Sequence, residues 1–140
     1  MQENCIFCKI IAGSIPSVTV YEDDSFKAIL DIAPAAKGHV LILPKKHADN
    51  LYDLDEEATK KVLYVVRKIA IALKEELGCD GINLLQNNGE AAGQTVMHFH
   101  IHLIPRYDND EIDMQWEKVN YGEGEAASMA SSIAGIINYF

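Results

Sequence analysis

"MHFHIHLIPR", residues 97–106, alternates histidines with apolar residues. His98, His100 and His102 occupy every second position. Successive side chains of a β-strand point to opposite faces, so a strand here places the three imidazoles on one face and apolar side chains on the other. Next-but-one residues of a strand lie roughly 6.6 Å apart, so the three rings cannot close on one metal ion without other ligands. The pattern predicts a half-buried strand that carries a functional site.

The composition fits one globular domain. The chain has 140 residues, of which 49% are hydrophobic, and we expect a single domain over residues 1–140. Its formal net charge of −9 disfavours nucleic-acid polymers and anionic lipid surfaces as partners. No apolar run reaches the ~18 residues that a membrane-spanning helix needs, and the start shows no signal-peptide pattern. We therefore expect a cytoplasmic protein without a membrane partner.

Short strand-like and helix-like segments follow one another along the chain. Between Asp53 and Leu77 apolar residues recur at spacings of three and four, which predicts an amphipathic helix opened by a capping box of Asp53 with Glu56. Strands joined mainly by hairpins, with one long helix, indicate an antiparallel α+β fold. We expect helical turns at 5–13 and 123–140, a loop at 107–116, and strands at 18–24, 25–32, 39–45, 81–88 and 97–106.

The chain has five histidines. His39 and His47 flank the third expected strand, and the other three lie in the fifth. A lone histidine on a strand is usually structural. Three in alternation, with the remaining two at the ends of one other strand, indicate a functional site instead.

The segment GQTVMHFHIHLIPR, residues 93–106, resembles the signature of the histidine triad (HIT) superfamily of nucleotide hydrolases and transferases. The similarity extends over CIFCKIIAGSIPSVTVYEDD, AILDIAPAAKGHVLILPKKH and NNGEAAGQTV, and so covers about residues 5–106. The resemblance implies a five-stranded antiparallel sheet with one long helix and short helices, paired with a second subunit into a ten-stranded sheet. Residues 107–140, a C-terminal loop and helix, lie outside this HIT core.

The resemblance also implies a role for each triad histidine. His100 would attack the α-phosphate of a nucleotide and form a covalent nucleotidyl-histidine, while its other ring N–H rests on the carbonyl of His98. A neutral imidazole, with an ordinary pKa near ~6.5, offers a lone pair for such an attack. His102 would donate to a non-bridging phosphate oxygen and offset its charge. His39 matches a histidine that occurs earlier in the family's sequences. That histidine supports the third triad member, here His102.

Further positions match the family's contacts to the leaving group and the nucleoside. Gln94 and Thr95 would face the scissile phosphate, and Thr95 leaves two substrate classes open, nucleoside phosphoramidates and dinucleoside polyphosphates. Asp31 matches a ribose-binding acid. Asn87 matches a residue near the phosphate, with a plain turn role as an equal alternative. The candidates for an apolar base slot, each also a candidate core residue, are Phe7, Ile10, Ile15, Ile29 and Ile32.

A second cluster begins with CIFC, residues 5–8. Cys5 and Cys8 can share one zinc ion, which needs two more ligands for a tetrahedron. His47 and His98 are the best candidates, and bacterial members of the family carry such a Cys₂His₂ site. Four protein ligands leave no open position, so we expect one structural zinc per chain and no cofactor in the chemistry. A metal-free thiol pair and a redox pair are the alternatives, the latter disfavoured because no strand precedes Cys5.

The leading functional hypothesis is an enzyme that transfers a nucleoside monophosphate from a purine nucleotide conjugate to His100 and then to water. One alternative is a nucleotide-binding or sensing protein with slow or no turnover. Another is a hydrolase that uses a metal-bound water, which the four-ligand zinc site disfavours. Because the family pairs subunits through the long helix and the fourth strand, we also expect a homodimer through residues 54–77 and 81–88.

Overall fold

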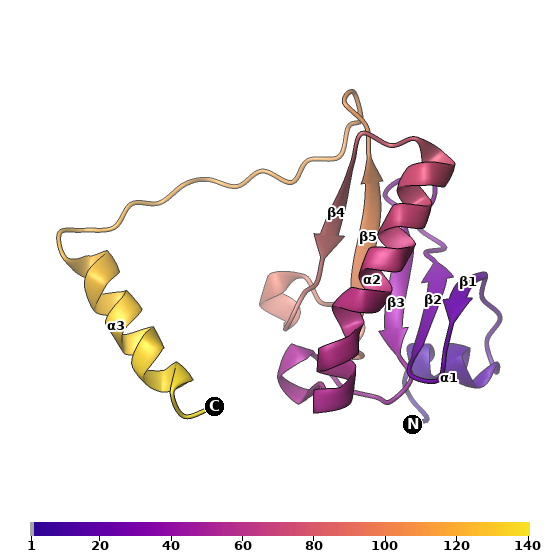
Figure 1. Cartoon of the computed structure of the whole chain (residues 1–140), viewed down its shortest axis with the longest axis horizontal. Helices are drawn as coiled ribbons and strands as arrows, with labels where there is room; N and C mark the ends of the chain where they lie inside the picture. Colours follow the sequence, from indigo (N-terminus) through magenta and orange to yellow (C-terminus); the bar gives the residue numbers. More distant parts are fainter. Residues whose placement is uncertain (1) are drawn as a thin grey trace.

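A five-stranded antiparallel sheet forms the centre of the molecule, and one long helix crosses one of its faces (Figure 1). This computed structural model describes residues 2–140. The strand order is β1-β2-β3-β5-β4, which confirms the expected α+β fold. The elements are α1 (Ile6–Ala12), β1 (Thr19–Glu22), β2 (Phe26–Leu30), β3 (Val40–Pro44), η1 (Leu51–Asp53), α2 (Glu56–Leu77), β4 (Gly81–Leu85), η2 (Glu90–Ala92), β5 (Ile101–Arg106) and α3 (Glu125–Ile137).

The two faces of the sheet bury separate apolar clusters. Because side chains alternate along a strand, Phe26 of β2 and Ile42 of β3 pack in the cluster under α2. Ile29 and Leu41, which are paired in the sheet and point to the opposite face, pack in the cluster that includes α1. His102 of β5 is paired with Leu41 in the sheet, and paired residues share a face. His102 therefore lies on the α1 face.

Helix α2 begins later than its apolar pattern predicts. The N-cap is Asp55, whose Oδ1 accepts the backbone N–H of Ala58 at 2.8 Å. Asp53 belongs instead to the short 3-10 helix η1. The predicted capping box of Asp53 with Glu56 is therefore wrong, because the carboxylate that reaches the free N–H groups of the first turn is that of Asp55.

Strand β5 covers only the second half of the predicted histidine strand, and His102 is the one triad member within it. His98 and His100 lie in the irregular segment before it. That segment is tied to the loop after β3, since the N–H of Phe99 donates to the carbonyl of Ala48 at 2.7 Å. The strand is therefore shorter than predicted, but the alternation holds. The apolar residues Phe99, Ile101 and Leu103 pack in the cluster under α2, while Phe7 of α1 packs against the rings of His98 and His100, so the three imidazoles share the α1 face.

Helices α1 and α3 and strands β1 to β4 lie inside their predicted ranges, whereas no element was predicted for η1. Helix α1 ends at Gly13, whose φ of 84° is a left-handed conformation that glycine adopts without strain. Helix α3 lies within the expected terminal helix. None of the helices in residues 2–140 is both long and apolar enough to span a membrane.

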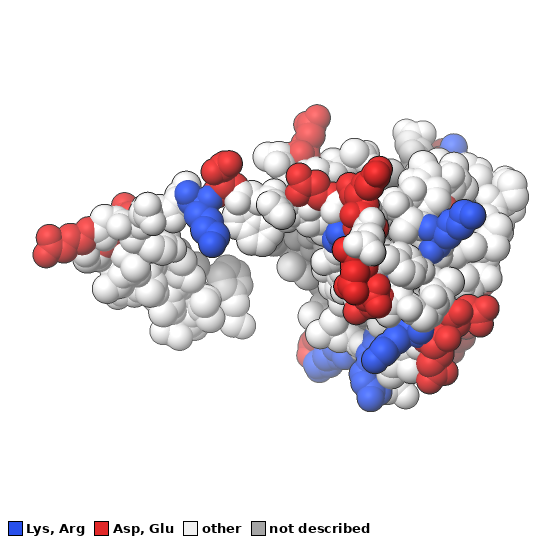
Figure 2. Space-filling view, turned by 90° about the horizontal axis from the view of Figure 1, so that it is seen from above, with Lys and Arg blue, Asp and Glu red and all other residues white. Residues whose placement is uncertain are grey.

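Residues 107–140, which we call the C-terminal arm, leave the end of β5 and extend away from the sheet (Figure 1). An extended linker carries α3 to the side of the molecule on which β4 lies (Figure 1). Every residue of α3 is exposed. Seen from above, the arm stands apart from the sheet and its helices (Figure 2).

Candidate active site and metal centre

His100 presents one ring nitrogen with a free lone pair. Its Nδ1 lies 2.7 Å from the carbonyl oxygen of His98. Because a carbonyl only accepts hydrogen bonds, Nδ1 carries the proton and Nε2 carries the lone pair. Burial lowers the pKa of His100, so the ring is neutral at neutral pH. His100 can therefore act as a nucleophile without a base to deprotonate it.

The carbonyl that orients His100 belongs to a fully buried residue. His98 has no exposed surface, and its Nε2–H donates to the carbonyl oxygen of Pro44 at 2.9 Å. Phe7 packs edge-on against both rings, with centroid distances of 5.9 Å to His98 and 5.1 Å to His100. These contacts hold His98 in one orientation and thereby fix the direction of its carbonyl.

His39 and His102 form a chain of hydrogen bonds that determines both tautomers. The backbone N–H of Ala35 donates to Nδ1 of His39 at 3.0 Å, so the ring proton of His39 lies on Nε2. This Nε2–H donates to Nδ1 of His102 at 2.9 Å. His102 consequently carries its proton on Nε2, which leaves that N–H to donate to a ligand.

Burial keeps this pair of imidazoles neutral. Burial, together with the neighbouring His100 and His39, lowers the pKa of His102 to about 4. Burial also lowers the pKa of His39, against the opposing effect of Asp31. The Asp31 carboxylate lies 3.7 Å from Nε2 of His39, beyond hydrogen-bond distance. At neutral pH His102 is thus a neutral donor.

Two cysteines and two histidines converge at the start of α1. Sγ of Cys5 lies 3.3 Å from Nδ1 of His98. Sγ of Cys8 lies 3.4 Å from Nδ1 of His47 and 3.6 Å from Nδ1 of His98. The two Nδ1 atoms are 3.1 Å apart. All four candidate ligand atoms lie within 4.8 Å of one another.

Both imidazoles direct a lone pair, rather than an N–H, into this cluster. Nε2 of His47 donates to the Asp49 carboxylate at 2.7 Å, as Nε2 of His98 does to Pro44, so Nδ1 of each ring is unprotonated. Two facing lone pairs repel unless a cation lies between them. Tetrahedral zinc, with bonds of about 2.3 Å to sulfur and about 2.05 Å to nitrogen, separates N–N pairs by about 3.3 Å and S–N pairs by about 3.5 Å. The four residues therefore fit a metal ion.

Cys5 links the cluster to the first turn of α1. Its Sγ accepts the backbone N–H of Cys8 at 3.3 Å, as the N-cap of the helix. Burial raises the pKa of the Cys5 thiol. A thiolate at this position therefore needs a cation beside it, which a metal ion would provide.

Comparison with known proteins agrees with this geometry. The HIT domain family matches residues 12–109. The chain belongs to the HIT family. A crystal structure of a HIT family member from Bacillus subtilis is 47% identical, covers 95% of this chain and 96% of its own, and has a TM-score of 0.90.

Two further relatives bear on the chemistry. The structure of a Zn-bound histidine triad family protein from Mycobacterium smegmatis is 35% identical, covers 98% of each chain and has a TM-score of 0.75. Adenylylsulfatase HINT3 from Arabidopsis thaliana is 44% identical over 110 residues, which are 79% of this chain and 56% of that protein.

The two residues expected at the scissile phosphate take different positions in this HIT structure. Gln94 is buried, and its amide is fully bonded to the backbone: Nε2 donates to the carbonyls of Asp49 at 2.6 Å and Val96 at 3.0 Å, and Oε1 accepts the N–H of Gly89 at 2.8 Å. Thr95 is exposed and lines a surface pocket with Asp49. Within residues 2–140 no hydrogen bond joins either side chain to a triad histidine.

The apolar candidates for the base slot divide between core and surface. Those packed in the cluster around α1 are Phe7, Ile10, Ile15 and Ile29. Ile32 differs, because its side chain is 95% exposed. The side chain of Ile32 is thus accessible to a ligand. The other four side chains pack in the apolar cluster between α1 and the sheet.

The polar candidates for nucleotide binding are both partly exposed. Asp31 lies at the end of β2, where its Oδ1 accepts the N–H of Ala33 at 2.9 Å. Asn87 lies beside the turn at Gly93, where an added Cβ would be 3.5 Å from the Asn87 amide nitrogen. The structure brings Asp31 next to His39, whereas Asn87 follows β4.

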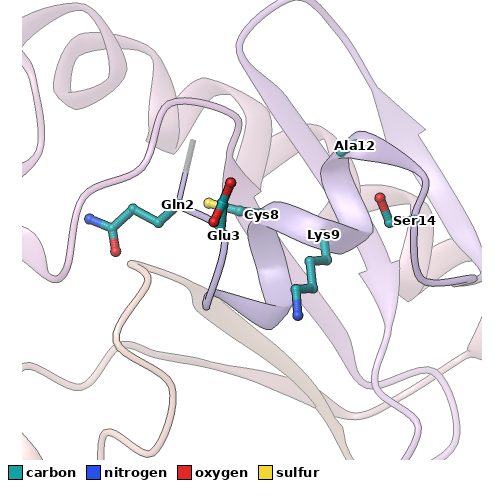
Figure 3. A pocket seen from close by; sticks show the side chains of 6 residues that line it. All are labelled: Gln2, Glu3, Cys8, Lys9, Ala12 and Ser14. Carbon is teal, nitrogen blue, oxygen red and sulfur yellow. The ribbon is translucent and has the colours of Figure 1, made fainter.

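A separate surface pocket lies beside α1 (Figure 3). None of the five histidines, all of which the structure describes, is among its lining residues. Among the four candidate metal ligands, the pocket is lined only by the buried Cys8. It is therefore distinct from the candidate active site. The lining residues are Gln2, Glu3, Cys8, Lys9, Ala12 and Ser14.

Three groups that orient the histidines are missing from the sequence-based expectations. Two are backbone groups, the N–H of Ala35 and the carbonyl of Pro44, and no side-chain pattern marks a backbone group. The third is the carboxylate of Asp49. Metal-ligating histidines commonly pair with a carboxylate, so an acid two residues after His47 was a usable signal.

Proposed function

We propose that this HIT protein is a nucleotide hydrolase or nucleotidyl transferase that cleaves purine nucleotide conjugates at the α-phosphate through a covalent nucleotidyl-His100. The observation that carries the proposal is the 2.7 Å hydrogen bond from Nδ1 of His100 to the carbonyl of His98. It leaves a lone pair on Nε2 of a neutral ring. The ring of His102, a neutral donor, lies with its centroid 4.9 Å from that of His100.

The reaction consists of two displacements at phosphorus. In the first, the lone pair of His100 Nε2 forms a P–N bond while the bond from phosphorus to the leaving group breaks, and that group takes the bonding electrons. In the second, water attacks phosphorus and loses a proton to bulk solvent, while the P–N bond breaks and its electrons return to Nε2. Nδ1 keeps its proton throughout. The His98 carbonyl dipole stabilises the positive ring that the first step creates.

His102 acts on the charge of the phosphate. Its Nε2–H donates to a non-bridging oxygen, whose negative charge rises in the transition state. His39 holds this tautomer by donating to Nδ1. Gln94 positions the segment before the triad through its backbone bonds, and the exposed hydroxyl of Thr95 is proposed as a contact to the leaving group.

The nucleoside would lie beside Asp31 and Ile32. The Asp31 carboxylate is partly exposed and can accept hydrogen bonds from both ribose hydroxyls. Ile32 offers exposed apolar surface for a purine base. Asn87 is proposed as a polar contact near the phosphate.

We further propose that the cluster at α1 holds one structural zinc ion. Its ligands would be Cys5, Cys8, His47 and His98, which fit a tetrahedron in distance and tautomer. Bound zinc would hold these four side chains together and offer no open position for water. The Mycobacterium smegmatis relative is described as Zn-bound, which supports this metal.

A panel of AMP conjugates tests the proposed activity. Because one relative is named an adenylylsulfatase, adenylyl sulfate joins adenosine phosphoramidate and diadenosine polyphosphates in the panel. We expect AMP release from at least one of these conjugates. This release should be faster than the release of the pyrimidine nucleoside monophosphate from the matching pyrimidine conjugate. Binding of AMP with no release from any conjugate would favour a nucleotide-binding protein with slow or no turnover.

We also propose a homodimer through α2 and β4. Within residues 2–140, strand β4 is the last in the sheet and pairs only with β5, so one edge of its backbone has no partner there. Leu63 of α2 and Leu84 of β4 expose 64% and 49% of their surfaces. A free strand edge beside exposed apolar side chains favours pairing with another chain.

A further inference from the structure

The two cysteines of the cluster at α1 lie against surface pockets although both side chains are buried. Cys5 exposes 8% of its surface and Cys8 exposes 1%. Cys8 lines the pocket beside α1 (Figure 3), and Cys5 lines the pocket that contains Thr95. A water molecule takes up about 30 Å³ in the liquid, so the pocket beside α1, with a volume of about 400 Å³, admits small solutes to Cys8.

The two sulfur atoms are placed to bond to each other. Their Sγ atoms lie within 4.8 Å of one another. Sγ of Cys5 accepts the backbone N–H of Cys8 at 3.3 Å, so the Cys5 side chain already folds over the first turn of α1. Residues three apart along a helix lie on the same side, and proteins that cycle between dithiol and disulfide use this Cys-x-x-Cys spacing. A disulfide between the two therefore requires side-chain movement rather than unfolding of α1.

Such a disulfide is incompatible with the proposed metal site. The thiolate is the form of cysteine that binds metals and reacts with oxidants, and the sulfur atoms of a disulfide carry no charge. With both sulfurs joined, His47 and His98 are the remaining two of the four ligands that a tetrahedral zinc site requires. Oxidation of the cysteine pair therefore removes the metal as well as the thiolates.

Loss of the cation leaves two lone pairs facing each other. Nδ1 of His47 and Nδ1 of His98 are 3.1 Å apart, and both are unprotonated. Sγ of Cys5 lies 3.3 Å from Nδ1 of His98 and moves toward Cys8 when the disulfide forms. The His98 ring thus loses the contacts on its Nδ1 side and is repelled by the His47 ring.

The main chain of His98 carries this change to the triad. His98 is fully buried and packs edge-on against Phe7, so its ring cannot swing freely and the main chain moves with it. The carbonyl of His98 accepts the Nδ1–H of His100 at 2.7 Å. A shift of His98 therefore changes the orientation of His100.

We propose that Cys5 and Cys8 form a peroxide-sensitive modification site, whose disulfide releases the metal and misaligns His100. The oxidant is hydrogen peroxide. The thiolate of Cys5, the more exposed of the two, attacks one peroxide oxygen, so that an S–O bond forms, the O–O bond breaks and hydroxide leaves. The thiolate of Cys8 then attacks the Cys5 sulfur, so that the S–S bond forms, the S–O bond breaks and a second hydroxide leaves. The two sulfurs lose two electrons in total, and the peroxide gains them.

Titration of the zinc-loaded full chain with hydrogen peroxide tests the modification. We expect one zinc ion, measured with a chromogenic chelator, to be released for each Cys5–Cys8 disulfide, which peptide mass spectrometry identifies by the loss of two hydrogen atoms. Dithiothreitol with added zinc should reverse both changes. Because dithiothreitol does not reduce methionine sulfoxide, this recovery separates the disulfide from methionine oxidation.

Cys79→Ala is the matched control for the oxidation. Cys79 is a free, buried cysteine that is not among the four clustered ligands, so this variant should release zinc at a rate within twofold of the wild-type chain. The metal release and the loss of turnover rest on the proposed function, whereas the disulfide does not. A loaded chain that keeps its zinc, or loses it without the disulfide, would overturn this proposal alone. A reduced chain that binds no zinc would overturn the metal site as well.

Imidazole NMR signals follow the step from His98 to His100 without a substrate. In a chain with ¹⁵N-labelled histidine, the ring signals of His100 should shift when the disulfide forms and return after reduction with zinc. Because misplacing a reacting group by about 1 Å costs on the order of 10²-fold in rate, turnover of AMP conjugates should fall by at least about tenfold. Unchanged His100 signals in the oxidised chain, or unchanged turnover, would overturn the coupling. A reduced chain without turnover but with the His100 shift would contradict only the proposed activity.

Discussion

The carbonyl oxygen of His98 lies 2.7 Å from Nδ1 of His100, while the ring of His98 lies 3.3 Å from Sγ of Cys5. His98 thus contributes its side chain to the group of four candidate metal ligands and its main-chain carbonyl to the orientation of His100. Because His98 is fully buried, neither part can move without the other. Changes at the cluster should therefore reach His100.

Loss of one cysteine ligand should lower both zinc content and stability. We expect about one zinc per chain in the purified protein, and Cys8→Ala should lose it. Because structural zinc contributes several kcal/mol or more to folding, the midpoint of thermal unfolding should fall by at least about 10 °C. Cys79→Ala is the matched control, since Cys79 is buried but lies outside the cluster. A zinc-free wild-type protein, or equal midpoints for the two variants, would contradict the proposed site.

His102→Ala should lower kcat by about 10²-fold, because it removes one donor that stabilises charge in the transition state. His39→Ala should lower kcat by a smaller factor, because His102 keeps its ring and loses only the hydrogen bond that fixes its tautomer. Steady-state kinetics on the best conjugate of the panel measure both. Turnover of His102→Ala within twofold of wild type would remove the assigned role.

Acid should destabilise the fold through His102. Its folded pKa is about 4, below the ordinary value near 6.5, so between these values the unfolded chain binds a proton that the folded chain does not. The free energy of unfolding therefore decreases as the pH falls from about 6.5 to about 4. In denaturant titrations at pH 7 and pH 4.5, His102→Gln should lose less stability than wild type, because its amide oxygen still accepts from His39 but does not titrate. An identical loss would show that His102 is not the source.

Gln94→Glu should destabilise the protein although it hardly changes the shape of the side chain. The amide nitrogen donates to two carbonyls, and a carboxylate oxygen in its place would face both without a proton. Leaving such buried groups unpaired costs at least about 2 kcal/mol. Gln115→Glu, on the exposed linker, should change the free energy of unfolding little in the same chemical denaturation. Equal stability of the two variants would contradict the backbone-positioning role.

Side-chain patterns predicted most of the fold. The three- and four-residue spacing from Leu54 to Leu77 marked α2, and the continuous apolar run within residues 39–45 marked β3. Pattern alone could not tell Asp53 from Asp55 as the helix cap, because both precede the same apolar residues. That choice depends on which carboxylate reaches the N–H of Ala58.

The candidate site was predictable in its residues and not in its geometry. The four predicted metal ligands lie close together, with their ligand atoms within 4.8 Å of one another. These ligands are Cys5, Cys8, His47 and His98. The alternation of the triad histidines predicted the face they share, but it did not predict that His98 and His100 precede β5 or which backbone groups their rings bond. Such bonds depend on tertiary contacts that a local pattern does not contain.

The nucleophile is the centre of the account, and trapping its adduct tests it most directly. Rapid quenching of the wild-type protein with a conjugate labelled at the α-phosphate, followed by peptide mass spectrometry under alkaline conditions, should place one nucleotidyl group on His100. His100→Asn should form no adduct and turn over at least about 10³-fold more slowly, while it still binds AMP, because the nucleoside contacts lie elsewhere. An adduct on another residue, or near-normal turnover by His100→Asn, would contradict the mechanism.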